Sequence, residues 1–249
     1  MVTREASDNS AQPPVLYAYL LGQVTVADAL YLQRKLLYDC SGNRGTRAAL
    51  LLCEHPTSLT IGRKGSRLHI VPDDDELRRR EIPLVWVPRG GGCWLHLPGQ
   101  LVTYAVFPIM HCGPSRYREG VRDAIKAVLT ELGVGPFSIG PDGTVESTGR
   151  LLGAMGIAIH RSYATFGFWL NVSLQTHHFK MLQFDQGVPV RATTIEALRG
   201  KRTRMSLVRE CVVRQYCRAL GVSEYFVSAG EHQLRTWFSS DAKLTGRAS

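Results

Sequence analysis

The chain has 249 residues, of which 44% are hydrophobic and 20% charged, and it carries a formal net charge of +9. These values are ordinary for a soluble globular protein with a substantial core. No apolar run approaches the roughly 20 residues that a membrane-spanning helix needs. The polar first residues also lack the apolar segment of a signal peptide, so a cytoplasmic protein without membrane contact is expected. The positive charge is spread out and accompanies no nucleic-acid-binding motif, so nucleic acid is not expected as a partner.

In chain order the pattern predicts strand 15–21, helix 25–38, strands 48–53 and 58–61, helix 73–80, strands 82–87 and 101–107, helix 115–132, strands 151–159 and 168–174, and helix 205–220. Thr25 and Asp28 have the spacing of a capping box. Asp142-Gly143 is a hairpin signal. This irregular alternation favours an α+β fold in one domain, residues 15–238, between a disordered tail at 1–14 and a loose tail at 239–249.

Cysteine and histidine spacing gives no sign of a metal or redox site. The chain has six cysteines and eight histidines, and no two cysteines stand in C-x-x-C spacing. We therefore expect neither a metal ion nor a cofactor.

The stretch from Arg89 to Gln100 is the strongest candidate for a site. Its three consecutive glycines, residues 90–92, suit a backbone that bends sharply and lets a ligand approach closely. Arg89 and His96 place polar groups on both sides of these glycines. A glycine-rich hairpin between two strands is the structural alternative, but the polar residues favour a binding site. Residues 62–65, Gly-Arg-Lys-Gly, are a weaker candidate for binding an anion.

Four segments resemble, in order and spacing, the signature of the lipoate–protein ligase B family. These octanoyltransferases move an octanoyl group from acyl carrier protein to a lysine on a lipoyl domain. The similar segments are Arg89 through Tyr104, Leu59 to Arg63, Gly167 to Val172, and Thr193 to Ile195. The resemblance extends from about residue 15 to residue 226 and so covers nearly the whole chain.

The resemblance implies the fold of the biotin/lipoate ligase superfamily, a mixed, largely antiparallel sheet with helices packed on it. It implies two protein partners: octanoyl-loaded acyl carrier protein, and the lipoyl domains of 2-oxoacid dehydrogenases or the glycine cleavage H protein. The protein is expected to act as a monomer. The implied substrate-binding residues are Arg63, Arg89, Gly90, Gly91, His96, Gln100, Gly153, Ala154 and Gly167.

The chain departs from the family where the chemistry should occur. In the family a lysine activates a cysteine, which carries the acyl group as a thioester. Here Leu151 stands in the lysine position and Asp185 in the cysteine position. Three further positions gain bulk or lose polarity: Trp94 replaces a threonine, Leu97 replaces a glycine, and Phe166 replaces a histidine.

Several alternatives stay open. Cys93 is a candidate nucleophile, with His96 three residues on as its base. Lys64 or Lys180 is a conceivable replacement lysine. The function is then either octanoyl transfer by an altered mechanism, or that of a catalytically inactive homologue that binds acyl chains, acyl carrier protein or lipoyl domains. An ATP-dependent ligase is disfavoured, because it also needs a lysine at position 151 and the chain lacks an adenylation loop.

Overall fold

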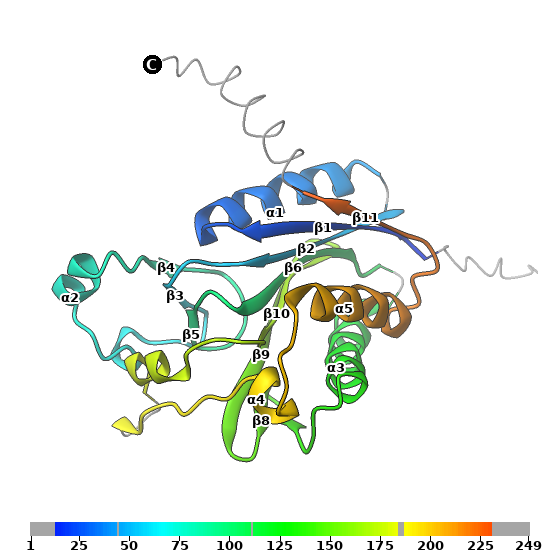
Figure 1. The fold of residues 1–249 in the computed structure, drawn as a ribbon. Helices are drawn as coiled ribbons and strands as arrows, with labels where there is room; N and C mark the ends of the chain where they lie inside the picture. Colours follow the sequence, from blue (N-terminus) through cyan, green and yellow to red (C-terminus); the bar gives the residue numbers. More distant parts are fainter. Residues whose placement is uncertain (1–12, 44, 111, 184–186, 231–249) are drawn as a thin grey trace, which may run out of the picture.

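A computed structural model describes residues 13–43, 45–110, 112–183 and 187–230 of the chain (Figure 1). The strands of its larger sheet are β1 (Val15–Gln23), β2 (Arg47–Glu54), β6 (Gln100–Pro108), β7 (Ser138–Ile139), β8 (Thr144–Ser147), β9 (Arg150–His160), β10 (Tyr163–Asn171) and β11 (Tyr225–Ala229). Within the described residues these eight strands lie in the order β11-β1-β2-β6-β10-β9-β8-β7. Strand β1 pairs in parallel with both neighbours, and the other neighbours are antiparallel. The predicted mixed, largely antiparallel sheet is confirmed.

A smaller sheet holds the glycine-rich stretch. It consists of β3 (Ser58–Ile61), β4 (Leu84–Trp86) and β5 (Cys93–His96), in the order β4-β3-β5 within the described residues. Strand β3 is parallel to β4 and antiparallel to β5. The alternative of a single hairpin between strands 82–87 and 101–107 is therefore wrong. The chain makes an additional strand, β5, before it enters the larger sheet, because residues 93–96 find their hydrogen-bond partners on β3.

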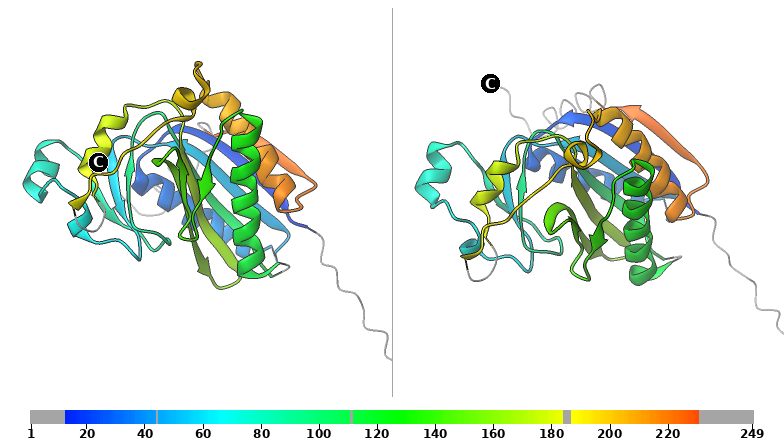
Figure 2. Two further views of the ribbon diagram at one scale, coloured as in Figure 1. Left: turned by 90° about the horizontal axis from the view of Figure 1, so that it is seen from below. Right: turned by 60° about the horizontal axis from the view of Figure 1, so that its bottom comes forward.

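The helices are α1 (Val26–Ser41), α2 (Asp74–Arg79), α3 (Gly113–Glu131), α4 (Ile195–Arg199) and α5 (Met205–Ala219), with short 3-10 turns η1 (Arg67–His69) and η2 (Thr176–Met181). Helices α3 and α5 cover one face of the larger sheet, while α1 and the smaller sheet cover the other (Figures 1 and 2). Alternate residues of β2 divide between two cores, with Leu50 facing α3 and α5 and Leu51 facing α1. The α+β fold class is confirmed.

Most predicted helices form where their caps and apolar faces place them. Thr25 accepts a hydrogen bond from the backbone N–H of Asp28 and begins α1, as its spacing predicted. This helix continues three residues beyond the predicted end at Tyr38. The hairpin at residues 142–143 is also confirmed, because β7 and β8 pair in antiparallel around it.

Three parts of the prediction are wrong or lie outside the described residues. Strand β10 begins at Tyr163, five residues before the predicted start, because its first half pairs with both β6 and β9. Strand β11 and η2 were not predicted. The predicted tails lie almost wholly at residues 1–12 and 231–249, outside the described residues. Within those residues no helix has the length and apolar character needed to cross a membrane.

Candidate functional site

The glycine loop, residues 89–92, packs against the basic loop, residues 62–65. Gly91 adopts a φ of 81°, in the left-handed region that favours glycine. Backbone N–H groups of the basic loop donate to carbonyls of the glycine loop: Gly62 to Gly92 (3.0 Å), Arg63 to Arg89 (3.0 Å) and Lys64 to Gly91 (3.1 Å). Gly90 donates across to Ile157 of β9 (3.2 Å). Residues 62–65 and 89–92, which the sequence suggested as two separate binding segments, therefore pack together as one unit.

Arg89 holds this unit together from inside. It is only 2% exposed. Its Nη1 donates to the carbonyls of Gly90 (3.1 Å) and Gly92 (3.0 Å), and its Nη2 to the carbonyl (3.1 Å) and hydroxyl (2.7 Å) of Thr60. Among the described residues no carboxylate forms an ion pair with it. Burial lowers the pKa of Arg89 to about 9, so the guanidinium stays charged at neutral pH. It binds oxygen atoms of the glycine loop and of Thr60 on β3.

His96 belongs to a buried chain of side chains. Its Nδ1–H donates to Oε1 of Gln100 (2.8 Å), and the Thr60 hydroxyl donates to its Nε2 (3.1 Å). Gln100 in turn donates to the Leu95 carbonyl and to Oδ1 of Asn171, each at 3.1 Å. Both ring nitrogens are therefore occupied, and burial keeps the pKa of His96 well below its usual range. A neutral imidazole with both nitrogens used by protein groups is not free to act as a base in this arrangement.

Cys93 points away from this chain. It lies three positions before His96 on β5, and residues an odd number apart on a strand face opposite sides. The Cys93 thiol donates to the Ser66 carbonyl (3.2 Å), and burial raises its pKa. The Cys93–His96 pair considered from the sequence is therefore not formed. Lys64 shares a cavity lining with Cys93, whereas Lys180 lies on η2 outside that lining.

The raised pKa of Cys93 gives the first testable prediction. Its alkylation by iodoacetamide in the folded protein should be slow at pH 7 and accelerate only above the usual range of a free thiol, about pH 8.5, because only the thiolate reacts. Site-resolved mass spectrometry of the modified peptide measures this rate. The same peptide in the denatured protein is the control. A rate midpoint for folded Cys93 below that of the denatured control would contradict the assignment of a protonated thiol.

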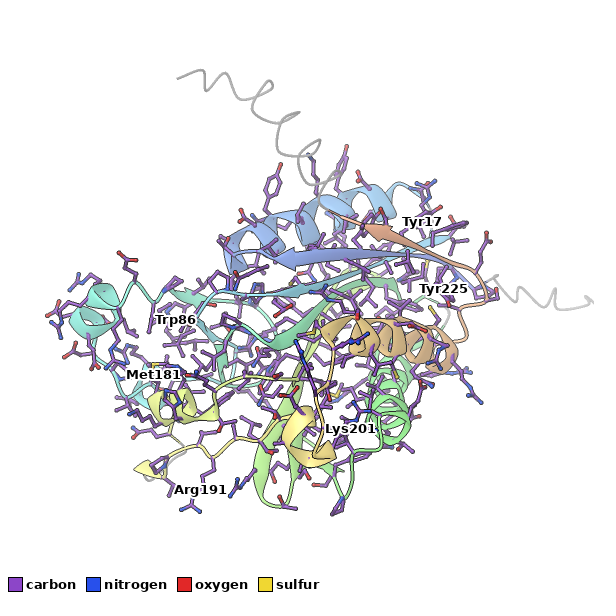
Figure 3. All side chains as sticks on the ribbon, in the orientation of Figure 1. Tyr17, Trp86, Met181, Arg191, Lys201 and Tyr225 are labelled. Carbon is purple, nitrogen blue, oxygen red and sulfur yellow. The ribbon has the colours of Figure 1, made fainter. Side chains whose placement is uncertain are left out.

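Leu151, at the position expected for the family's lysine, lines a cavity of about 220 Å³. Cys93, Ala154 and Trp169 line the same cavity. Two backbone hydrogen bonds connect Leu151 to the segment after η2, where Arg191 lies (Figure 3). The Leu151 N–H donates to the Arg191 carbonyl (2.8 Å), and the Leu151 carbonyl accepts from the Thr193 N–H (3.0 Å). Asp185 lies outside the described residues. The cavity thus joins the Leu151 strand to the glycine loop, while Arg89, His96 and Gln100 do not line it.

The other expected substrate-binding residues divide between surface and core. Arg63 donates from its Nη2 to the Ile157 carbonyl at 3.4 Å in an exposed position. Gly153 and Gly167 lie inside the β9–β10 pair. A Cβ on Gly167 would lie 2.5 Å from the Thr103 hydroxyl, so no side chain fits there. Both glycines serve the close approach of neighbouring strands.

The sequence did not identify His55 as a residue of the site, although it is fully buried there. His55 donates from Nδ1 to the Val24 carbonyl (2.7 Å) and accepts at Nε2 from the Tyr104 hydroxyl (2.8 Å). Its ring meets that of His96 edge to face, with centroids 5.1 Å apart. Burial lowers the pKa of His55 to about 4. A lone histidine after a strand gives no sequence signal of such an environment.

The described residues contain no group of three or more His, Cys, Asp or Glu side chains that could hold a metal ion. The site offers hydrogen-bond donors, the Cys93 thiol and a cavity with both apolar and polar lining residues.

Comparison with known proteins decides the family. The "Lipoyl protein ligase A/B catalytic domain" profile matches residues 25–217. The chain belongs to the lipoyl protein ligase A/B family. It is similar to an octanoyltransferase of Myxococcus xanthus, with 31% identity over 80% of this chain and 58% of that protein. It is also similar to an octanoyltransferase of Porphyromonas gingivalis, with 30% identity over 80% of this chain and 43% of that protein. The chain thus spans about half the length of these two relatives.

The fold is likewise similar to that of a solved lipoate protein ligase. A lipoate protein ligase from T. acidophilum with bound lipoic acid superposes with a TM-score of 0.65. The match covers 92% of this chain and 96% of that chain at 18% sequence identity. The resemblance to lipoate–protein ligase B noted in the sequence is therefore confirmed.

Proposed function

We propose that this protein works in lipoate biosynthesis and protein lipoylation, where it binds an octanoyl group presented by acyl carrier protein. The observation that carries the proposal is the cavity of about 220 Å³ between the glycine loop and β9. Its apolar lining residues include Leu151, Ala154 and Trp169, and polar residues such as Lys64, Asp142 and Gln183 complete the lining. Leucine in place of a lysine removes a charge from this lining, and burying a fatty chain against apolar surface is favourable.

We further propose that the bound acyl group does not become covalently attached to the protein. A thioester intermediate needs a thiolate and a group that activates it. Leu151 cannot supply an ammonium group. The cysteine in the cavity lining, Cys93, donates its proton to the Ser66 carbonyl and has a raised pKa. Lys64 also lines the cavity, but burial still raises the pKa of Cys93, and the charges that lower it belong to Arg89 and Arg67. We therefore propose that Cys93 and Lys64 do not replace the family's dyad.

Two protein partners belong to the same proposal. The net charge of +9 favours association with acidic proteins, as acyl carrier protein and lipoyl domains are. Arg63, exposed at the edge of the glycine loop, together with Gly90 and Gly91, is proposed to contact the carrier. A cytosolic site of action and a monomeric state are proposed on the same footing.

Octanoyl transfer itself is the second candidate. It is favoured by the two octanoyltransferase relatives, about 30% identical over 80% of this chain. Without an acyl-enzyme, the acceptor lysine would attack the carrier's thioester carbonyl directly. The amide C–N bond would form, the C–S bond would break, and the carrier thiol would leave with the proton lost by the amine.

Calorimetric titration with octanoyl-loaded acyl carrier protein tests the binding function. We expect a saturable heat that is much smaller with unacylated carrier and that weakens with added salt. Ala154→Leu, which fills part of the cavity, should weaken binding about tenfold or more, because an overpacked site rejects the chain. Ala27→Leu makes the same change at an exposed position of α1 and should leave binding unchanged. Equal affinity for loaded and unloaded carrier would contradict the proposal.

A further inference from the structure

The cavity at Leu151 has a neighbour deeper in the protein. A small void of about 10 Å³ lies beside Arg89, His96, Tyr104, Phe166 and Gly167. Among the described residues, Trp94 alone lines both this void and the cavity of about 220 Å³. The indole of Trp94 contacts Arg89 of the void's lining and Trp169 of the cavity's lining, and so lies between the two spaces.

The indole is held firmly in this position. The Arg89 guanidinium carbon lies 3.2 Å from the ring centroid of Trp94, and the ring of Trp169 meets it edge to face at 6.0 Å. A Cβ on Gly156 would lie 2.8 Å from the indole, so the glycine leaves the space that the ring fills. Trp94 is 8% exposed. Contacts on several sides make the indole a fixed partition rather than a side chain that swings aside.

We propose that Trp94 is the floor of the acyl-binding cavity and sets the longest acyl chain that the protein accepts. This inference rests on the proposed octanoyl binding and adds its specificity. An acyl chain that enters past Leu151 ends against the indole. Removal of the indole would join the cavity to the inner void, where Phe166 and Val102 offer further apolar surface. Each additional buried methylene would then strengthen binding about fourfold.

A purely structural role for Trp94 predicts a different outcome. If the indole only filled the core, its removal would destabilise the protein and weaken binding of all chain lengths alike. If it is the floor, its removal changes the order of preference among chain lengths.

The test compares Trp94→Ala with Trp86→Ala, the same substitution at an indole that is 65% exposed on β4 (Figure 3). Affinities are measured for carrier loaded with octanoyl, decanoyl, dodecanoyl and tetradecanoyl groups. We expect the wild type and Trp86→Ala to bind octanoyl best. Trp94→Ala should bind dodecanoyl about tenfold or more tighter than the wild type does. Trp94→Phe, a smaller change that keeps a ring, should show an intermediate shift and serves if the alanine variant unfolds.

The outcomes separate this inference from the proposed function. If the wild type binds octanoyl carrier but the Trp94 variants keep its chain-length profile, the inference is overturned and the binding function stands. If only the Trp94 variants bind acyl carrier, the indole blocks entry of the acyl chain, and both octanoyl binding by the wild type and the role of Trp94 as a floor are overturned. If no form binds, both are overturned. Indole should raise the melting temperature of folded Trp94→Ala, but not that of Trp86→Ala, by filling the space released.

Discussion

Arg89→Met should destabilise the protein by about 3–5 kcal/mol, the largest effect expected of any single change in the site. The substitution removes four hydrogen bonds, which Arg89 donates to the carbonyls of Gly90, Gly92 and Thr60 and to the Thr60 hydroxyl. Of these acceptors, the Gly92 carbonyl keeps the hydrogen bond from the Gly62 N–H. The methionine side chain fills part of the volume of the arginine but cannot donate any of these hydrogen bonds. Urea unfolding measured by circular dichroism determines the free-energy difference.

Arg63→Met is the matched control for this prediction. The Arg63 side chain makes one long hydrogen bond, 3.4 Å, in an exposed position, so its replacement should change stability by less than about 0.5 kcal/mol. Similar small effects for both variants would mean that Arg89 does not hold the glycine loop. A large loss of stability confined to Arg89→Met would support its role inside the loop.

The second large effect is expected from pH. Burial lowers the pKa of His55 to about 4, and it holds the pKa of His96 well below the usual range. Between about pH 6.5, the value for an unfolded histidine, and the lower folded value, the unfolded chain binds more protons than the folded chain. Stability is therefore full above about pH 6.5 and falls as the pH is lowered, by up to about 1.4 kcal/mol per pH unit for each histidine.

Denaturant unfolding between pH 7 and 5 measures this dependence, above the range in which most carboxylates titrate. His55→Gln should remove part of the slope. His160→Gln, at an exposed position, should leave the slope as it is in the wild type. A wild-type stability that stays constant over this window would contradict the buried, neutral state of the two histidines.

The parts of the fold that the sequence predicted are those with strong local signals. Helices α3 and α5 form within two residues of the predicted bounds, because their apolar residues repeat with helical periodicity. Strand β11 lacks such a signal. Its side chains are exposed or half-buried on both faces, and it exists through its pairing with β1. Strand β5 was missed for a similar reason, since its partner residues on β3 lie 32 to 38 positions earlier in the chain.

For the site, residue types were predictable and their directions were not. The sequence alone identified Leu151 as an apolar residue at a position expected to be charged. It could not show that the Arg89 guanidinium donates hydrogen bonds to the carbonyls of its own loop. An arginine at this position looks the same in the sequence whether it binds a ligand or the protein itself. Nor could the sequence show that the side chains of Cys93 and His96 point to opposite sides. Their directions follow from the extended conformation of residues 93–96, which form β5. The role of Trp94 required the two cavities on either side of it.

The protein is proposed to bind an octanoyl group without carrying it covalently. The most direct measurement is the intact mass of the protein after incubation with a large excess of octanoyl-loaded acyl carrier protein, recorded both under native conditions and after denaturation. We predict a non-covalent complex with the carrier under native conditions and an unchanged protein mass after denaturation. A protein that retains an octanoyl group after denaturation would contradict the claim, and peptide mapping of that group would identify the nucleophile.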